Sequence, residues 1–248
     1  MLVHGGGSTA RFWDRLLPFL DRPALAVDLP GRNGKPADLD SLTVDDEVAA
    51  VVEDVLQAGL EGPLTLVAHS SGGLVVPGVV AALADRDGPA AGPAVGPVTR
   101  IVLSAALVPE EGGCGIDCMK PKHREGLVWA LEQARKDGTS IRTAGPPADA
   151  ESFRHAYGGD PLDDDTLAYM VDPVRCVADT VHHYFQPVRW SMAGSVPVTY
   201  LLNERDRPVP SATQEEMVTR LPSCVVVRLD CGHLPAVTEP ERFATLLG

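Results

Sequence analysis

Four short segments of the chain hold residue types that can carry out nucleophilic chemistry. One is LTLVAHSSGGLV, residues 64–75, in which an apolar run leads directly into Ser70 and then into a second apolar run. A serine in a sharp turn between a strand and a helix exposes its hydroxyl above the end of a sheet, and small neighbours let the two elements approach closely. Ala68 stands where glycine is usual, which adds one methyl group. Tight turns without chemistry share this composition, but the flanking strand and helix predict that Ser70 is a nucleophile.

The segment VHGGG, residues 3–7, is a glycine run at the end of a predicted strand. Glycines allow backbone N–H groups to face a site, and we predict that the N–H groups of Gly6 and Ser71 form an oxyanion hole. A nucleotide-binding loop is the alternative, but no G-x-G-x-x-G pattern and no phosphate-binding lysine follows. We expect His4 to hold the loop by hydrogen bonds rather than to transfer protons.

A base and an acid follow the nucleophile along the chain. His233 lies in DCGHLP, just beyond the last predicted strand, and Asp206 lies in LLNERDRPVP, between a strand and a turn that contains prolines. The order Ser, Asp, His is one of those in which catalytic triads occur. We therefore predict Ser70 as nucleophile, His233 as general base and Asp206 as the acid that orients the histidine. Glu204 is the alternative acid.

The elements around these segments alternate between short apolar runs and amphipathic stretches. This alternation is typical of an α/β fold with a mostly parallel sheet and helices on both faces. The predicted strands span residues 2–3, 24–27, 64–68, 100–104, 196–202 and 225–229. The predicted helices span residues 11–20, 44–58, 74–84, 211–221 and 240–247.

Residues 109–190 interrupt this alternation with several short helical patterns and no convincing strand. We predict an α/β core formed by residues 1–108 and 191–248 and an inserted helical cap formed by residues 109–190. Residues 85–98 are rich in glycine, proline and alanine, which predicts a surface loop. Aromatic residues of the insertion suggest an apolar pocket, although core packing uses the same types: Trp129, Phe153, Tyr157, Tyr169, Tyr184, Phe185 and Trp190.

The segments VHGGG, AHSSGG, RDRPVP and CGHLP stand in the order and spacing of the α/β-hydrolase superfamily, which the chain resembles over nearly its whole length. The modest insertion and the region from residue 153 to 187 are similar to the methylesterase and hydroxynitrile lyase group. The resemblance implies an esterase-type serine hydrolase. Such an enzyme cleaves an ester or related acyl bond of a small to medium apolar substrate through an acyl-serine intermediate, without a cofactor.

The resemblance has two departures. Hydroxynitrile lyases of this group generally place a lysine directly after the histidine, where this chain has Leu234. Members of the superfamily normally carry two strands before the strand that leads into the glycine run. In this chain Met1 lies on the strand that leads into the glycine run, so we expect the two N-terminal strands to be missing. Backbone groups at or near this sheet edge would be exposed, so we expect either a homodimer or cover by another part of the chain.

The chemistry of the four segments leaves other functions open. A lyase, a cyclase or a thioesterase of a biosynthetic pathway can use the same triad. A non-catalytic ligand receptor on this fold is a further alternative, because a fold does not by itself imply a function.

Composition narrows the classes of partner and location. A net charge of -13 and a pI of about 4.9 work against binding to nucleic acid or to a membrane surface. No apolar run reaches the roughly 18 residues of a membrane span, and the N-terminus does not resemble a secretion signal, which predicts a cytoplasmic protein. Five cysteines are an odd set for a disulfide framework. Cys114, Cys118 and His123 offer too few ligands, so we predict no metal site.

Overall fold

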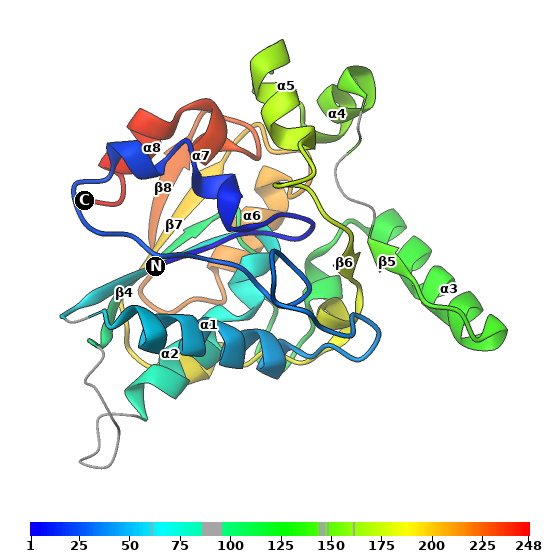
Figure 1. Ribbon diagram of the computed structural model, residues 1–248, viewed down its shortest axis with the longest axis horizontal. Coiled ribbons are helices and arrows are strands. Elements are labelled where there is room, and N and C mark those ends of the chain that lie inside the picture. Colours follow the sequence, from blue (N-terminus) through cyan, green and yellow to red (C-terminus); the bar gives the residue numbers. More distant parts are fainter. Residues whose placement is uncertain (61, 86–95, 144–146, 148, 161) are drawn as a thin grey trace.

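A six-stranded parallel sheet forms the centre of the computed structural model, which describes residues 1–248 except 61, 86–95, 144–146, 148 and 161 (Figure 1). The strands lie in the order β2-β1-β3-β4-β7-β8. Their bounds are Leu2–Val3 (β1), Ala26–Val27 (β2), Leu64–His69 (β3), Val98–Ser104 (β4), Val198–Asn203 (β7) and Val225–Leu229 (β8). All neighbouring pairs in this sheet are parallel, so the predicted α/β architecture is confirmed.

Helices cover both faces of this sheet. One face packs against α1 (Val44–Ala58), α2 (Val76–Ala84) and α6 (Ser211–Val218), and the other against α7 (Pro235–Thr238) and α8 (Pro240–Thr245). Figure 1 shows α1 and α2 on one side of the strands and α7 and α8 on the other. The bounds of α1 are those predicted, because a capping box of Thr43 and Asp46 begins it and Gly59, with φ 57°, ends it.

Side chains of each inner strand alternate between two buried layers. In β3, Leu66 and Ala68 face the layer of α1 and α2, while Val67 faces the layer that holds Phe12 and Trp13. All five side chains are at most 2% exposed. This burial on both faces explains why the strands read as nearly continuous apolar runs instead of alternating ones.

The segment predicted as a helix over residues 11–20 forms two 3-10 turns instead, at Ala10–Trp13 and Leu17–Phe19. Pro18 has no N–H group with which to continue a helix from the preceding turn. The apolar spacing that suggested a helix is still used for burial, because Phe12, Trp13 and Leu16 pack against the sheet.

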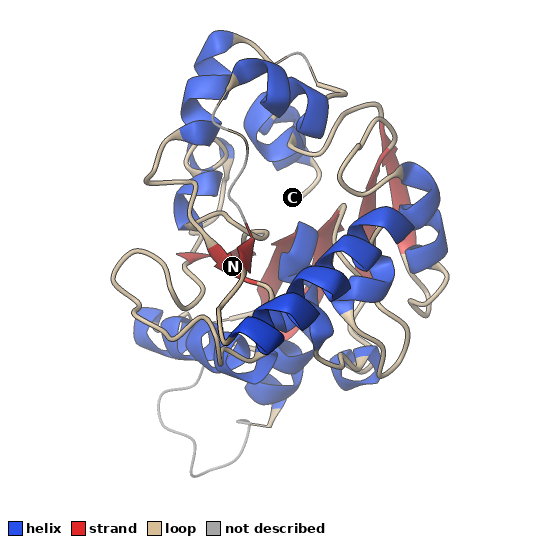
Figure 2. Cartoon of the chain, turned by 90° about the vertical axis from the view of Figure 1, so that its right-hand side faces the viewer, coloured by secondary structure: helices blue, strands red, loops and turns tan. Residues whose placement is uncertain are grey.

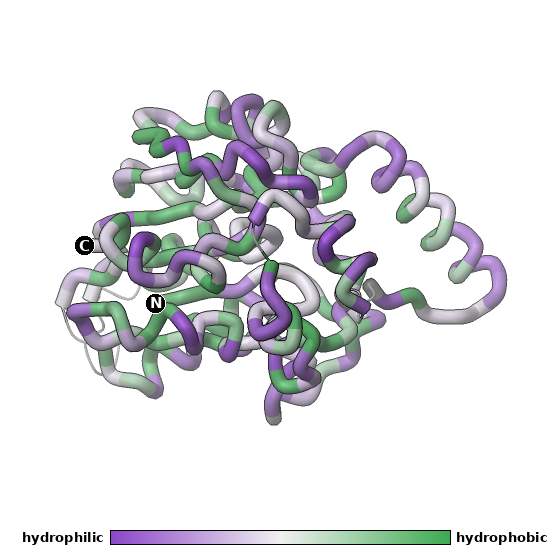
Figure 3. The backbone as a smooth tube through the Cα atoms, turned by 90° about the horizontal axis from the view of Figure 1, so that it is seen from above, coloured by the Kyte–Doolittle hydropathy of each residue, from purple (hydrophilic) through white to green (hydrophobic). Residues whose placement is uncertain are grey.

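Residues 109–190 contribute α3 (Pro121–Asp137), α4 (Ala150–Tyr157) and α5 (Asp164–Val171). In Figure 2 the long helix α3 lies nearest the viewer with the strands behind it, and Figure 3 shows that its residues are largely hydrophilic. Of the α3 side chains, only Leu131 and Ala134 are buried. A short antiparallel pair, β5 (Arg142–Thr143) with β6 (Asp179–Thr180), also lies here. These two strands contain polar residues and no apolar run, so the sequence pattern did not indicate them. The division into core and cap remains a prediction.

Strand β1 is paired on both sides, with β2 and with β3, and β2 is the outer strand of the sheet. The expectation of an exposed edge therefore applies to β2. Most of the surface loop predicted for residues 85–98 lies outside the described residues, since 86–95 are not described. Among the helices that are described, none is both long and apolar enough to cross a membrane.

Candidate active site

Ser70 lies at the carboxyl end of β3, in a turn that adopts a rarely used backbone conformation. Its φ is 53°, in the left-handed region that non-glycine residues seldom occupy. The residues that follow leave no room for larger side chains. A Cβ atom on Gly72 would lie 2.5 Å from the carbonyl oxygen of His4, and one on Gly73 would lie 2.5 Å from that of Leu107. Packing on both sides thus holds the serine in the strained turn that the sequence predicted.

Asp206 and His233 meet although they are 27 positions apart in sequence. The Nδ1 atom of His233 lies 2.6 Å from Oδ2 of Asp206, and both residues are at most 6% exposed. Oδ1 of Asp206 accepts a hydrogen bond from the N–H of Val209 at 2.8 Å. The carboxylate therefore fixes the tautomer with a proton on Nδ1 and leaves Nε2 of His233 free to accept a proton.

The alternative acid lies elsewhere. Glu204 is exposed, and its carboxylate pairs with Arg228 at 3.5 Å rather than with the histidine. Its backbone N–H donates to the carbonyl oxygen of Leu229, which ties the strand ends together. Of the two candidate acids, Asp206 is therefore the one that contacts His233.

The glycine run passes directly beside Ser70. A Cβ atom on Gly5 would lie 2.8 Å from the Cβ of Ser70, and one on Gly6 would lie 3.1 Å from the Oγ of Ser71. The structure thus brings the two predicted oxyanion-hole residues, Gly6 and Ser71, to the side of Ser70. A Cβ atom on Gly6 would also lie 2.7 Å from the hydroxyl oxygen of Tyr184, so a larger residue than glycine does not fit there.

His4 holds this glycine loop in place. The ring is completely buried, its Nδ1–H donates to the carbonyl oxygen of Gly5 at 2.8 Å, and its Nε2 accepts from the N–H of Leu29 at 3.4 Å. Burial lowers the pKa of His4 to about 4, so the ring is neutral near pH 7. A neutral ring with both nitrogens occupied matches the expected structural role.

A buried ion pair beneath the loop was not predicted from the sequence. Arg32 and Asp179 pair with side chains that are at most 1% exposed, and Oδ2 of Asp179 also accepts the N–H of Gly7 at 2.9 Å. The Nε–H of Arg32 donates to the carbonyl oxygen of Ser8 at 2.9 Å. Burial is the largest single influence and acts to raise the pKa of Asp179. Arg32, His183 and the N–H of Gly7 act together in the opposite direction and hold this pKa below its usual value. The pair therefore anchors the glycine loop to the segment before β7.

Asp160 is a second residue that the sequence did not reveal. Its carboxylate accepts the N–H of Gly232 at 2.5 Å and that of Leu234 at 3.4 Å, the two residues that flank His233. A Cβ atom on Gly232 would lie 2.6 Å from Asp160, so only glycine permits this approach. The only local signal is the pair of glycines at 158–159, and Gly159 adopts a φ of 124°.

His69 packs against the loop that holds His233. Its Nε2–H donates to the carbonyl oxygen of His233 at 2.9 Å, and its ring stacks on Phe12 with centroids 4.8 Å apart. Burial and the neighbouring His233 ring lower the pKa of His69 well below 6.5. It is therefore a neutral residue that positions the loop of His233.

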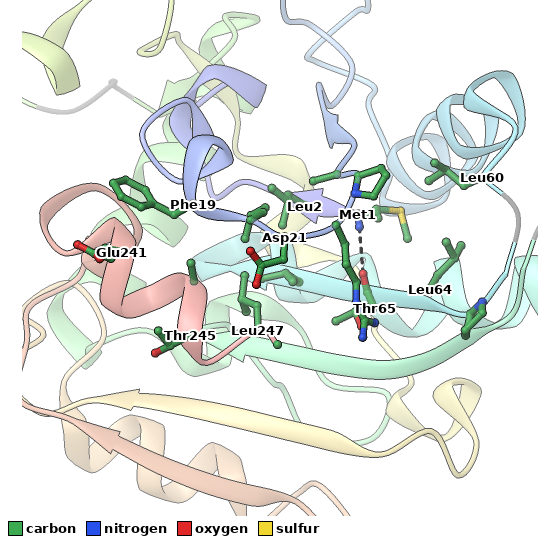
Figure 4. A pocket seen from close by; sticks show the side chains of 18 of the residues that line it. Met1, Leu2, Phe19, Asp21, Leu60, Leu64, Thr65, Glu241, Thr245 and Leu247 are labelled. Atoms are coloured by element: carbon green, nitrogen blue, oxygen red, sulfur yellow. Dashed lines mark hydrogen bonds between the residues drawn. The ribbon is translucent and has the colours of Figure 1, made fainter.

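A cavity of about 810 Å³ opens onto Ser70 and His233. Gly5, Gly6 and residues from the segment between β4 and β7 form other parts of its wall. Of the seven aromatic residues predicted to shape a pocket, Tyr157 and Tyr184 line it. A larger cavity of about 1000 Å³ lies at the opposite, amino ends of β1 and β3 (Figure 4), and Ser70, Asp206 and His233 do not line it.

Cys118 is a second nucleophile type in the wall of the cavity. Burial raises the pKa of its thiol to about 11, so the thiolate is scarce near pH 7. All five cysteines are free thiols. In the part of the chain that the structure describes, no group of three or more metal-ligating side chains is assembled.

We expect the free energy of unfolding to fall as the pH is lowered from about 7 towards 4. His4 and His69 are buried with lowered pKa values, so the unfolded chain binds protons in this range that the folded chain does not. Their stabilisation is complete above about pH 6.5, the pKa of an unperturbed histidine, and is lost as the pH falls towards 4. Each unit of pKa difference corresponds to about 1.4 kcal/mol. Urea unfolding at about pH 7, 6 and 5 measures this loss.

Two variants separate this effect from other titrations. His4→Asn removes one titrating ring, so the loss of stability between pH 7 and 5 should become smaller, whereas His123→Asn on the exposed side of α3 should keep the parent's loss. Burial acts to lower the pKa of His183, but Glu47 raises it, and this opposite contribution is present in all three proteins. An undiminished loss in His4→Asn would contradict the assignment.

Comparisons with known proteins identify the family to which the chain belongs. The chain matches the model of the alpha/beta hydrolase family over residues 1–246. An extracellular alpha/beta-hydrolase from a Paenibacillus species has a TM-score of 0.75 at 20% identity, with 99% of this chain and 96% of that chain covered. A pyrethroid hydrolase from Sphingobium faniae has a TM-score of 0.73 at 20% identity, with 99% and 94% covered.

A methylesterase from Arabidopsis has a TM-score of 0.65 at 20% identity, with 99% of this chain and 96% of that chain covered. No curated protein sequence matches the chain. At such identities the solved structures establish the shared fold, while the family match extends over nearly every residue. The chain therefore belongs to the alpha/beta hydrolase family.

Proposed function

We propose that this hydrolase cleaves a carboxylic ester through an acyl-serine intermediate formed on Ser70. The observation that carries the proposal is the buried contact of 2.6 Å between His233 and Asp206, at a cavity that the strained Ser70 also lines. A serine hydroxyl is a weak nucleophile until a neighbouring base accepts its proton, and an oriented neutral imidazole is such a base.

The reaction has two halves. His233 accepts the proton of Ser70 as Oγ attacks the ester carbonyl, and the negative charge on the carbonyl oxygen is stabilised by the N–H groups of Gly6 and Ser71. His233 then donates this proton to the departing alcohol as the ester C–O bond breaks. In the second half His233 accepts a proton from water as the water attacks the acyl group. His233 then returns this proton to Oγ of Ser70 as the acyl–Oγ bond breaks, which releases the acid and restores the free serine.

The surroundings of the site support an ester of small to medium size. A cavity of about 810 Å³ is in the range of pockets for ligands of that size. Solved proteins of similar fold include a pyrethroid hydrolase, a methylesterase and an esterase from Thermogutta terrifontis. The residue after the base, Leu234, is 1% exposed and apolar, so it supplies no charge for lyase chemistry.

Turnover of p-nitrophenyl esters with short and long acyl chains tests this function. We expect a rapid release of p-nitrophenol equal to the amount of enzyme, followed by steady turnover. p-Nitrophenolate is a good leaving group, so the acyl-serine forms faster than it is hydrolysed and accumulates. A serine-directed phosphonate should stop turnover and label Ser70. Pure protein that releases no p-nitrophenol from any ester and is not labelled by the phosphonate would show that the proposal is wrong.

A further inference from the structure

The fixed charges that line the active-site cavity are all positive. Lys120 and Arg207 contribute to the wall beside two further histidines, His123 and His155, and the described lining residues include no aspartate or glutamate. The chain as a whole has 34 acidic and 21 basic residues. The charge of the cavity wall is therefore opposite in sign to the net charge of the chain.

Neither cation is neutralised by a carboxylate among the described residues. The ammonium group of Lys120 donates to the carbonyl oxygen of Arg207 at 2.5 Å. The guanidinium of Arg207 donates to the carbonyl oxygens of Arg154 at 3.3 Å and His155 at 3.0 Å. By contrast, the nearby Arg205 pairs with Asp230 at 3.3 Å. Backbone carbonyls thus hold the two cations in place and leave their charge available to a ligand.

The local sequence around Lys120 also places positive charge where helix energetics oppose it. Lys120 is the residue before α3, whose first turn contains no acid and continues with Lys122 and His123. Helices α1, α4 and α5 each carry acidic residues in their first turn, as the helix dipole favours. Residues at a functional site are expected to depart from such local preferences where the site needs them. The positive charge at the start of α3, beside the cavity, fits this expectation.

We propose that the ester cleaved at Ser70 carries a carboxylate, which Lys120 and Arg207 bind at the wall of the cavity. The inference rests on the proposed function and names its substrate class. The substrate is either a monoester of a dicarboxylic acid or a hydroxy acid that is esterified at its hydroxyl group and keeps its carboxylate. The net charge of -13 repels anions at long range, so a preference for an anionic ester must arise from these nearby cations.

Two matched pairs of esters test the preference. Monomethyl adipate is compared with methyl hexanoate, and 4-acetoxybenzoate with phenyl acetate, so that the carboxylate lies on the acyl side in one pair and on the alcohol side in the other. We expect kcat/KM for the anionic ester to exceed that for its neutral partner by about tenfold in at least one pair, a typical gain from one charge-assisted contact. The pair that shows the preference identifies the side that carries the carboxylate.

Variants of Lys120 show whether the cations cause the preference for the anionic ester. Lys120→Met should lower the anionic-to-neutral ratio about tenfold, Lys120→Glu should lower it further, and Lys120→Arg should retain most of it. Lys136→Met removes the same charge from the far end of α3, away from the cavity, and should leave the ratio unchanged. Labelling of Ser70 by a neutral phosphonate verifies that the site is intact in each variant.

Arg207 gives an independent comparison. Arg207→Gln should lower the ratio as Lys120→Met does, whereas Arg205→Gln, two residues away and outside the cavity wall, should not. Added salt should also reduce the preference, because screening weakens contacts between partly exposed charges.

The outcomes separate this inference from the proposed function. If neutral esters are cleaved and neither anionic ester is preferred, the enzyme is an esterase and the carboxylate site is wrong. A preference that survives in both Lys120→Glu and Arg207→Gln also overturns it. If no ester of either kind is cleaved and Ser70 is not labelled, the proposed function and this inference are both wrong.

Discussion

Ser70→Ala is expected to lower kcat for ester hydrolysis by about four to six orders of magnitude, because it removes the atom that forms the acyl bond. The surrounding site is unchanged by the loss of one hydroxyl. Alanine must adopt the same φ of 53° that serine does, so the free energy of unfolding should change by no more than about 1 kcal/mol. Steady-state turnover of a p-nitrophenyl ester and urea unfolding measure the two quantities.

Ser223→Ala is the matched control for this variant. Ser223 also has a left-handed backbone, with φ 56°, but it is exposed in the turn before β8 and does not line the cavity. Ser223→Ala should keep full activity, and its free energy of unfolding measures how well alanine is tolerated at a positive φ. Substantial turnover by Ser70→Ala would contradict covalent catalysis, and a phosphonate attached to Ser71 would move the nucleophile by one residue.

Asp206→Asn is expected to lower kcat by about four orders of magnitude. The amide keeps the size of the carboxylate but removes the charge that stabilises the protonated imidazole. It can also donate to Nδ1 of His233, which moves the proton to Nε2 and abolishes the base. Because Asp206 is 6% exposed, water does not replace the lost charge. Rates measured with the parent and the variant at several pH values determine the effect.

Glu204→Gln provides the comparison. This carboxylate is exposed and pairs with Arg228 at 3.5 Å, a surface contact worth at most about 1 kcal/mol of stability and no catalysis. Its kcat should stay close to that of the parent. A large loss in Glu204→Gln together with a small loss in Asp206→Asn would show that the acid had been assigned to the wrong residue.

The positions of the strands along the chain could be predicted because each buried strand is a short apolar run, which is a local pattern in the sequence. All six strands of the sheet were predicted to within two residues of their ends, and the bounds of α1 follow from its own cap residues. The helix predicted over residues 11–20 was wrong because apolar spacing does not register the missing N–H of Pro18.

The contacts that hold the site in place could not be predicted, because each joins segments that are far apart in sequence. Asp160 is 72 positions from Gly232, and Asp179 is 147 positions from Arg32. Charged residues in loops normally lie in solvent, so nothing local marks these carboxylates as partners of distant groups. Only the packing of the segment before β7 against the glycine loop and against the loop of His233 brings these groups into contact.

The sequence by itself determined the fold class and the identity of Ser70, His233 and Asp206 as candidates. Each of these is encoded by a short motif whose turn residues and flanking strand act over a few residues. The tertiary structure alone decided that Asp206 rather than Glu204 meets His233, and that Lys120 and Arg207 share a cavity with Ser70. The physical reason is that such contacts depend on the relative positions of whole elements, which arise from burial of both faces of the sheet at once and not from any local pattern.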